Sequence, residues 1–200
     1  TFDTGWGWGA KFFDYDNDGW LDLYVTNGWV SAGTDSYVPD VFEMIIKPGI
    51  DLSDARNWPP MGTKSLSGYQ KKRLFHNERG QVFTDQAPKY GVDSTRDGRG
   101  IATADFDNDG RVDMFVANAN GEPFLYRNTM PDTGHWAAFE LTGVQSNRLA
   151  VGAQVRVTAG GRTQLRFVDG GNSFAGQGSM RLHVGLGAAT TIDKVEVRWP

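Results

Sequence analysis

Apolar and polar residues alternate along several short stretches of this chain, and the clearest alternation occurs twice. In 21–26 and again in 112–117, alternate positions carry Leu, Val or Met. These positions are Leu21, Leu23 and Val25 in the first stretch and Val112, Met114 and Val116 in the second. A period of two residues predicts a β-strand in each stretch, with one face of the strand apolar.

The two strands belong to a longer internal repeat. Gly9–Asn27 aligns without a gap with Gly100–Asn118, so the offset is 91 positions. Each copy contains a β-prone run, an acidic loop and a second strand. Matching short strands follow at 73–77 and 124–128, and a turn at 78–80 leads from the first of them into 81–84. Four short antiparallel strands in such a unit are typical of a propeller blade, so we expect an all-β fold.

Two further segments complete the predicted organisation. An insertion at about 29–70 contains four prolines and a short predicted helix at 40–47, and we consider it either a cap on the sheets or a lid that contacts a ligand. Composition changes near 131–134. Five mostly alternating stretches with Gly-rich turns follow, which predict a small antiparallel β domain. The expected domains are 1–130 and 131–200.

The acidic loops carry the candidate chemistry. Aspartates stand at positions 1, 3, 5 and 9 of both loops, and position 7 offers a backbone carbonyl, which is the ligand pattern of a Ca²⁺ loop. A glycine at position 6, Gly19 or Gly110, allows the sharp turn around an ion. The candidate ligands are Asp14, Asp16, Asp18, Trp20 and Asp22 in the first loop, and Asp105, Asp107, Asp109, Arg111 and Asp113 in the second.

An EF-hand and a Mg²⁺ site both fit these loops less well. An EF-hand needs Glu at position 12 and a helix on each side, whereas position 12 is Val25 or Val116 and the flanks are strand-like. Mg²⁺ prefers few carboxylates and keeps several waters. We therefore predict two Ca²⁺ sites that neutralise crowded carboxylates and stabilise the fold. Ca²⁺ sites of extracellular modules suit a compartment with millimolar calcium.

At these residues the sequence resembles the FG-GAP, or VCBS, repeat family of β-propellers. Segments 27–30, 69–77 and 83–91 are similar to bacterial proteins related to cartilage acidic protein, and 141–200 resembles the ASPIC/UnbV domain. The sequence departs from the family patterns at Trp29, where His is common, and at Leu149, where Asp is common. The family implies about seven blades, and this chain holds about two. The resemblance therefore implies that missing blades or other chains complete the ring.

Composition and charge narrow the function. A net charge of −4 disfavours nucleic acid as a partner, and Lys71–Arg73, the longest basic run, is expected to be a solvated face. No stretch is apolar and long enough to span a bilayer. Thr1–Thr4 begins without Met and contains neither the basic n-region nor the apolar h-region of a signal peptide, so we expect a processed chain or a piece. A chain without Cys fits a bacterial exported protein that relies on metal ions, located extracellularly, at the cell surface or in the periplasm.

The chain shows no catalytic motif that we recognise. Gly-x-Ser-x-Gly, His-Glu-x-x-His and phosphate loops are absent, and we expect structural roles for His76, His135 and His183. The tryptophans either fill the core or line a sugar- or peptide-binding surface. We predict a non-enzymatic, calcium-binding scaffold or adhesion module that binds a protein or glycan. The alternatives are an accessory region of a carbohydrate-active or redox enzyme complex, and a structural subunit of a surface assembly or filament.

Overall fold

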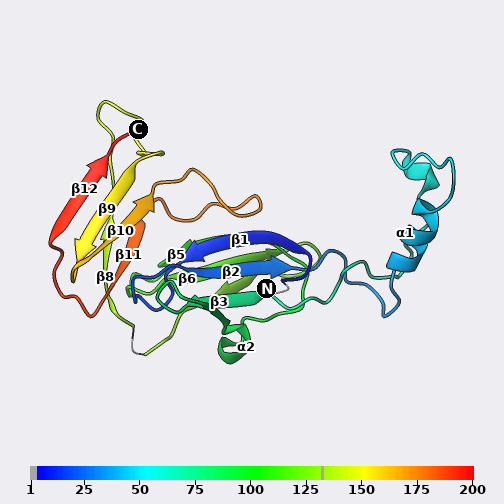
Figure 1. Ribbon diagram of the computed structural model, residues 1–200, viewed down its shortest axis with the longest axis horizontal. Helices are drawn as coiled ribbons and strands as arrows, with labels where there is room; N and C mark the ends of the chain where they lie inside the picture. The colour runs from blue at the N-terminus through cyan, green and yellow to red at the C-terminus, as the bar shows by residue number, and fades with distance from the viewer. Residues whose placement is uncertain (1–3, 132) are drawn as a thin grey trace.

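The computed structural model describes residues 4–131 and 133–200, and its regular structure is mainly β (Figure 1). Residues 1–3, which make up most of the Thr1–Thr4 segment discussed above, lie outside the described residues. Residue 132 of the expected second domain also lies outside them. The first sheet contains β1 (Gly7–Phe13), β2 (Asp22–Asn27), β3 (Arg73–Asn77) and β4 (Phe83–Asp85), hydrogen-bonded in that order. All three pairings are antiparallel. This four-stranded meander is the arrangement that the repeat predicts for a blade.

The second sheet repeats the first with one strand fewer. It contains β5 (Gly98–Ala104), β6 (Asp113–Asn118) and β7 (Phe124–Tyr126), also in chain order. The register of β5 against β6 pairs Ala104 with Asp113, as β1 and β2 pair Phe13 with Asp22. After β7 the chain passes into a different sheet, so the described residues supply no fourth strand here.

The first sheet packs against the second through β1, β2 and β5. Tyr24 and Thr26 of β2 are fully buried, although the sequence pattern places them on the polar face. The Tyr24 hydroxyl donates to the Val92 carbonyl oxygen at 2.7 Å. The Thr26 hydroxyl lies 2.7 Å from the Arg99 carbonyl oxygen of β5 and accepts from the Gly9 N–H at 2.9 Å. Thr26 therefore joins the two sheets, and Tyr24 ties the first sheet to the segment that leads into β5.

The basic run at 71–73 is not a solvated face, as the sequence suggested. Lys72 is fully buried, and its Nζ donates to the Arg96 carbonyl oxygen at 2.7 Å. Burial lowers the pKa of Lys72 to about 8, with Asp97 acting in the opposite direction. The neighbouring residues form ion pairs instead, Lys71 with Asp93 and Arg73 with Asp85.

Helical segments lie outside the sheets. The insertion contains α1 (Val38–Ile45) and the 3₁₀ turn η1 (Ala55–Asn57). The range of α1 overlaps that of the helix expected at 40–47. Figure 1 shows α1 standing away from both sheets. A second short helix, α2 (Ala87–Tyr90), follows β4 and was not expected. None of the helices among residues 4–131 and 133–200 is long and apolar enough to cross a membrane.

The C-terminal region forms two small sheets. One pairs β8 (His135–Phe139) with β11 (Leu182–Gly187). In the other, β9 (Gln154–Ala159) lies between β10 (Arg162–Phe167) and β12 (Lys194–Arg198). Val155, Val157 and Val184 are fully buried between them. These five strands agree with the expected antiparallel region, while the boundary at 130/131 remains a prediction.

Thr26 provides a test of the contact between the sheets. Thr26→Val keeps the shape of the side chain but removes both hydrogen bonds, which leaves the buried Gly9 N–H and Arg99 carbonyl without these partners. We expect a loss of about 2 kcal/mol in the free energy of unfolding. Urea denaturation monitored by tryptophan fluorescence measures this loss.

Thr163→Val is the matched control, because the Thr163 hydroxyl bonds only to that of Thr158 in an exposed pair. This variant should change the free energy of unfolding by less than about 0.5 kcal/mol. Equal losses in the two variants would argue against the proposed role of Thr26.

Candidate functional site

The two acidic loops have the same backbone conformation. The first connects β1 to β2 and the second connects β5 to β6. In each, Asn at position 4 has a positive φ, 60° for Asn17 and 57° for Asn108, and the glycine at position 6 has φ near 90°. The glycine N–H donates to the carboxylate at position 1 at 2.9 Å in both loops, Gly19 to Asp14 and Gly110 to Asp105. The left-handed turn thus brings the start of the loop back toward its middle.

The aspartate at position 9 fastens each loop to the sheet. Asp22 accepts from the N–H of Asn77 in β3 at 2.8 Å and from that of Tyr15 at 3.3 Å. In the second loop Asp113 accepts from the N–H of Asn128 at 2.7 Å and from that of Phe106 at 2.9 Å. Both carboxylates are buried. Each therefore ties the loop to the third strand of its sheet or to the residues just past it, a role that the sequence did not indicate.

The acidic side chains that lie close together occupy different positions in the two loops. In the first loop, Asp14, Asp16 and Asp18 each place a carboxylate oxygen within 4.8 Å of the others. In the second loop, the corresponding group is Asp105, Asp107 and Asp113. Clusters of this kind are able to hold a metal ion.

Asp109 and its counterpart Asp18 each accept from the N–H two residues later, that of Arg111 at 3.0 Å and that of Trp20 at 2.7 Å. Asp109 differs because it also forms an ion pair with the Arg111 side chain. Ion coordination by the ten candidate ligands, including the carbonyls of Trp20 and Arg111, remains a prediction.

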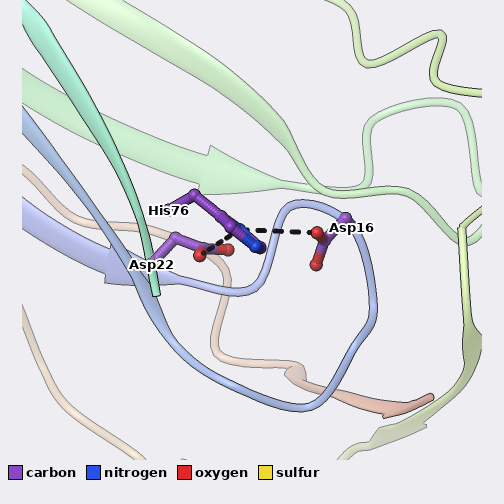
Figure 2. A group of neighbouring side chains, drawn as sticks. All are labelled: Asp16, Asp22 and His76. Carbon is purple, nitrogen blue, oxygen red and sulfur yellow. Dashed lines mark hydrogen bonds and ion pairs between the residues drawn. The ribbon is translucent and has the colours of Figure 1, made fainter. Parts of the chain in front are cut away.

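His76 is a site residue that the sequence analysis missed. Its Nδ1 lies 3.1 Å from Asp22 Oδ1 and 3.6 Å from Asp16 Oδ2, and Figure 2 shows the imidazole between the two carboxylates. Asp16, Asp22 and His76 form a second group that is able to hold a metal ion. The sequence signal for this role was its position in the repeated strand, one residue before Asn77. Arg127 occupies that position in the second copy.

The second copy of the repeat has Arg127 where the first has His76, and this difference makes the two loops electrostatically different. Arg127 donates through Nε to Asp107 at 2.7 Å, and its Nη2 lies 3.7 Å from Asp109. With Arg111, it places two guanidinium groups beside the second loop. The described residues give the acidic side chains of the first loop no guanidinium hydrogen bond or ion pair: Arg162 reaches the Gly19 carbonyl and stacks on the Trp20 ring at 4.2 Å. The positive charges of Arg162 and Arg166 still act on Asp18 and Asp14 over a longer distance. The arginines beside the second loop therefore pair directly with its carboxylates, whereas those near the first loop act on its carboxylates only through longer-range charge interactions.

Burial and mutual repulsion oppose ionisation in the first loop. Burial, followed by the charges of Asp16, Asp18 and Asp22, raises the pKa of Asp14 to about 8. Burial also raises the pKa of Asp22 to about 8, against the opposing effect of the Asn77 N–H. Asp14 Oδ1 is buried and accepts no hydrogen bond from the described residues. A divalent cation fits this donor set, because it would supply the missing partner and offset the repulsion.

The first loop is also held by the C-terminal region. Asn17 is fully buried; its Nδ2 donates to the Gly110 carbonyl of the second loop at 2.9 Å, and its Oδ1 lies 2.7 Å from His183 Nε2. Burial lowers the pKa of His183 to about 4, so the imidazole is neutral near pH 7 and donates through Nε2. A Cβ on Gly185 of β11 would overlap Asp14 and Asn17. One asparagine therefore contacts both loops and the C-terminal sheets.

Family comparisons agree with this arrangement. A model of the FG-GAP-like repeat matches residues 65–116, and a model of the ASPIC and UnbV family matches residues 143–200. The chain contains an FG-GAP-like repeat followed by an ASPIC and UnbV domain. The FG-GAP match runs from before β3 into β6, so it contains the second acidic loop but not the first. The first loop is related to the family through the internal repeat.

Curated relatives match a short segment. Cartilage acidic protein 1 of Mus musculus and that of Homo sapiens are each 48% identical over 54 residues, which is 26% of this chain and 8% of either relative. The Xenopus tropicalis protein of the same name is 46% identical over 59 residues, 28% of this chain and 9% of the relative. The chain thus matches less than a tenth of the length of these relatives.

The raised pKa values predict how stability depends on pH in chelator. Asp14 and Asp22 bind protons more tightly in the folded chain than in the unfolded chain, where carboxyl pKa values are about 3.9. Between these values the folded state carries more protons, so stability falls as pH rises. We expect the melting temperature in EDTA to fall by at least about 4 °C from about pH 5 to about pH 8.

Saturating divalent cation should remove this fall, since the bound ion stabilises the ionised carboxylates. Asp14→Asn should reduce the slope in EDTA because it removes one of the two titrating groups. Differential scanning calorimetry across this range measures both effects. A melting temperature that rises with pH in EDTA would contradict the assignment.

Proposed function

We propose that this chain is part of an exported, extracellular interaction module in which two Ca²⁺ ions hold its parts in one arrangement. The observation that carries the proposal is the position of Asn17. This residue lies within the first loop and bonds to the second loop through Gly110 and to the ASPIC and UnbV domain through His183. An ion that orders the first loop would therefore also order the contact between both sheets and the C-terminal domain.

Calcium is the ion that the donor set favours. Each loop offers four carboxylates and is supplemented by backbone oxygens, and Ca²⁺ takes six to eight oxygen ligands. His76 adds one nitrogen at the edge of the first loop, while Arg127, which is not a metal ligand, occupies the matching place in the second. At millimolar extracellular calcium, sites with dissociation constants of about 10⁻⁴ M would be largely filled.

The relatives support an extracellular setting. Their name, cartilage acidic protein, refers to a tissue whose bulk lies outside cells. These relatives come from vertebrates, so they give no support to the bacterial source expected from the sequence. We assign the chain to recognition of a protein or glycan.

Substitutions at position 3 test the calcium sites. Asp16→Asn and Asp107→Asn each remove one negative charge from one cluster and keep the shape of the side chain. Each filled site adds about 2.7 kcal/mol at about 100 times its dissociation constant. Each variant should therefore lose the part of the calcium-dependent rise in melting temperature that its own site supplies. In EDTA the melting temperature of Asp16→Asn should stay the same or increase, and that of Asp107→Asn should fall only slightly, because its exposed pair with Arg127 is lost.

Glu43→Gln is the control, because Glu43 lies on α1 and pairs only with Lys47. Its calcium-dependent rise should equal that of the unmodified chain. If Asp16→Asn and Asp107→Asn lowered the melting temperature equally with and without calcium, the two aspartates would be structural residues and not ligands.

The recognition role has its own test. The calcium-loaded chain, probed against immobilised glycans and extracellular proteins, should give at least one saturable signal that EDTA abolishes. Asp16→Asn should weaken that signal more than Glu43→Gln does. Turnover of a polysaccharide by the purified chain would instead support the enzyme-associated alternative.

A further inference from the structure

His76 of β3 lies between two carboxylates that belong to the loop between β1 and β2 (Figure 2). Its Nδ1 is 3.1 Å from Asp22 Oδ1 and 3.6 Å from Asp16 Oδ2. One ligand atom from each of the three side chains lies within 4.8 Å of the other two. With bonds of about 2.0–2.2 Å, two ligands of one tetrahedral metal ion lie about 3.4 Å apart. The two distances from Nδ1 lie on either side of that spacing, so the three side chains are placed as ligands of one small divalent ion would be.

A carboxylate on the far side of the imidazole favours a free lone pair on Nδ1. Glu78 Oε2 lies 3.8 Å from His76 Nε2, and the Thr84 hydroxyl donates to Glu78 Oε1 at 3.0 Å, which holds the carboxylate there. This arrangement favours the tautomer with its proton on Nε2, and histidines that bind metals commonly have such a partner on their other nitrogen. The lone pair of Nδ1 then faces Asp16 and Asp22, which offer only acceptors when ionised. A cation between the three groups removes their mutual repulsion.

Other contacts hold the three side chains in place and leave a route for an ion. The Asp22 carboxylate is buried and accepts from the Asn77 N–H through Oδ1, which retains a second lone pair for an ion. The Tyr15 ring packs edge-on against the imidazole, with 5.8 Å between the ring centroids. The side chains of His76 and Asp16 each keep 18% of their surface exposed. An ion is therefore able to enter from solvent and to meet ligands whose orientation is already set.

A buried acceptor next to these residues has no partner. Asp14 Oδ1 is buried and accepts no hydrogen bond from the described residues. A carboxylate oxygen of Asp14 lies within 4.8 Å of one from Asp16 and one from Asp18. A buried oxygen without a donor is costly, so a cation beside Asp16 would also be favourable for Asp14. Asp16 therefore belongs to two neighbouring groups, one of oxygen ligands alone and one that includes the His76 nitrogen.

The imidazole determines which class of ion the second group suits. Ca²⁺ takes oxygen ligands, whereas a combination of imidazole and carboxylates suits Zn²⁺ and related ions. The second loop provides a contrast within the same chain. Arg127 stands at the position of His76, its Nε donates to Asp107 at 2.7 Å, and a guanidinium has no lone pair to offer a metal. The repeat has thus given the first loop a nitrogen ligand and the second loop an arginine at the same place.

We propose that Asp16, Asp22 and His76 bind a nitrogen-accepting divalent ion of the Zn²⁺ class through His76 Nδ1, and that this ion competes with Ca²⁺ for the first loop. Competition follows because Asp16 and Asp22 are also candidate Ca²⁺ ligands, and two divalent ions so close together would repel each other. The inference goes beyond the proposed function, since the three side chains form the site whether or not Ca²⁺ is bound elsewhere. It makes the first loop, and not the second, sensitive to transition-metal ions.

Calorimetric titration of the metal-free chain with Zn²⁺ tests the proposal. We expect saturable binding that His76→Asn weakens by at least about tenfold, while the same substitution changes Ca²⁺ affinity by less than about threefold. The amide introduced at this position is still able to donate a hydrogen bond to Asp22, so the variant removes the nitrogen ligand and keeps that contact. His135→Asn is the matched control, because His135 is exposed on β8, and it should bind Zn²⁺ normally.

Long-range ¹H–¹⁵N correlation spectra of the imidazoles give a direct readout, because Zn²⁺ should move the Nδ1 resonance of His76 and leave those of His135 in place. An unmoved His76 resonance, equal loss of Zn²⁺ affinity in the two variants, or no saturation up to about 1 mM would overturn the proposal. The contact between His76 and Asp22 would then be a simple hydrogen bond.

The competition has a separate test in Asp107→Asn, which keeps the first loop intact. Loading this variant with Zn²⁺ should weaken its remaining Ca²⁺ binding by at least about tenfold, and an unchanged Ca²⁺ affinity would overturn the competition. The calcium-dependent rise in melting temperature is measured on zinc-free protein. If that rise is present while Zn²⁺ binding fails, this inference is wrong and the proposed calcium sites stand. If the rise is absent while Zn²⁺ binds through His76, the calcium sites are wrong and the Zn²⁺ site stands.

Discussion

The crowding of carboxylates in the acidic loops is the constraint on which the rest of the structure depends. Asp22 and Asp113 are buried because they accept backbone N–H groups that close the loops onto the following part of each sheet. Their burial brings the other aspartates of each loop close together, and Asp14 is left with a buried oxygen that has no donor among the described residues. The hydrogen bonds that shape the loop thereby create the repulsion, and a cation is the species that relieves it while keeping the loop closed.

The two loops meet this constraint differently. In the second loop Arg111 and Arg127 neutralise Asp107 and Asp109, and several residues of the loop are exposed to solvent. In the first loop His76 stands where Arg127 stands in the second copy, and the ASPIC and UnbV domain covers the loop through Asn17. The first loop is therefore the loop whose order matters most for the contact between domains.

Sequence patterns were sufficient for features that depend on neighbours along the chain. The period-2 alternation predicted β2 and β6, and the matched spacing of aspartates and glycines predicted two loops of one conformation. Sequence patterns did not predict the surroundings of a residue when those surroundings come from a distant segment of the chain. Lys72 is buried by Arg96 and its neighbours, and His76 meets Asp22 from a strand 54 positions away. The missing fourth strand of the second sheet in the described residues is a similar case, because the chain leaves that sheet for the C-terminal domain after β7.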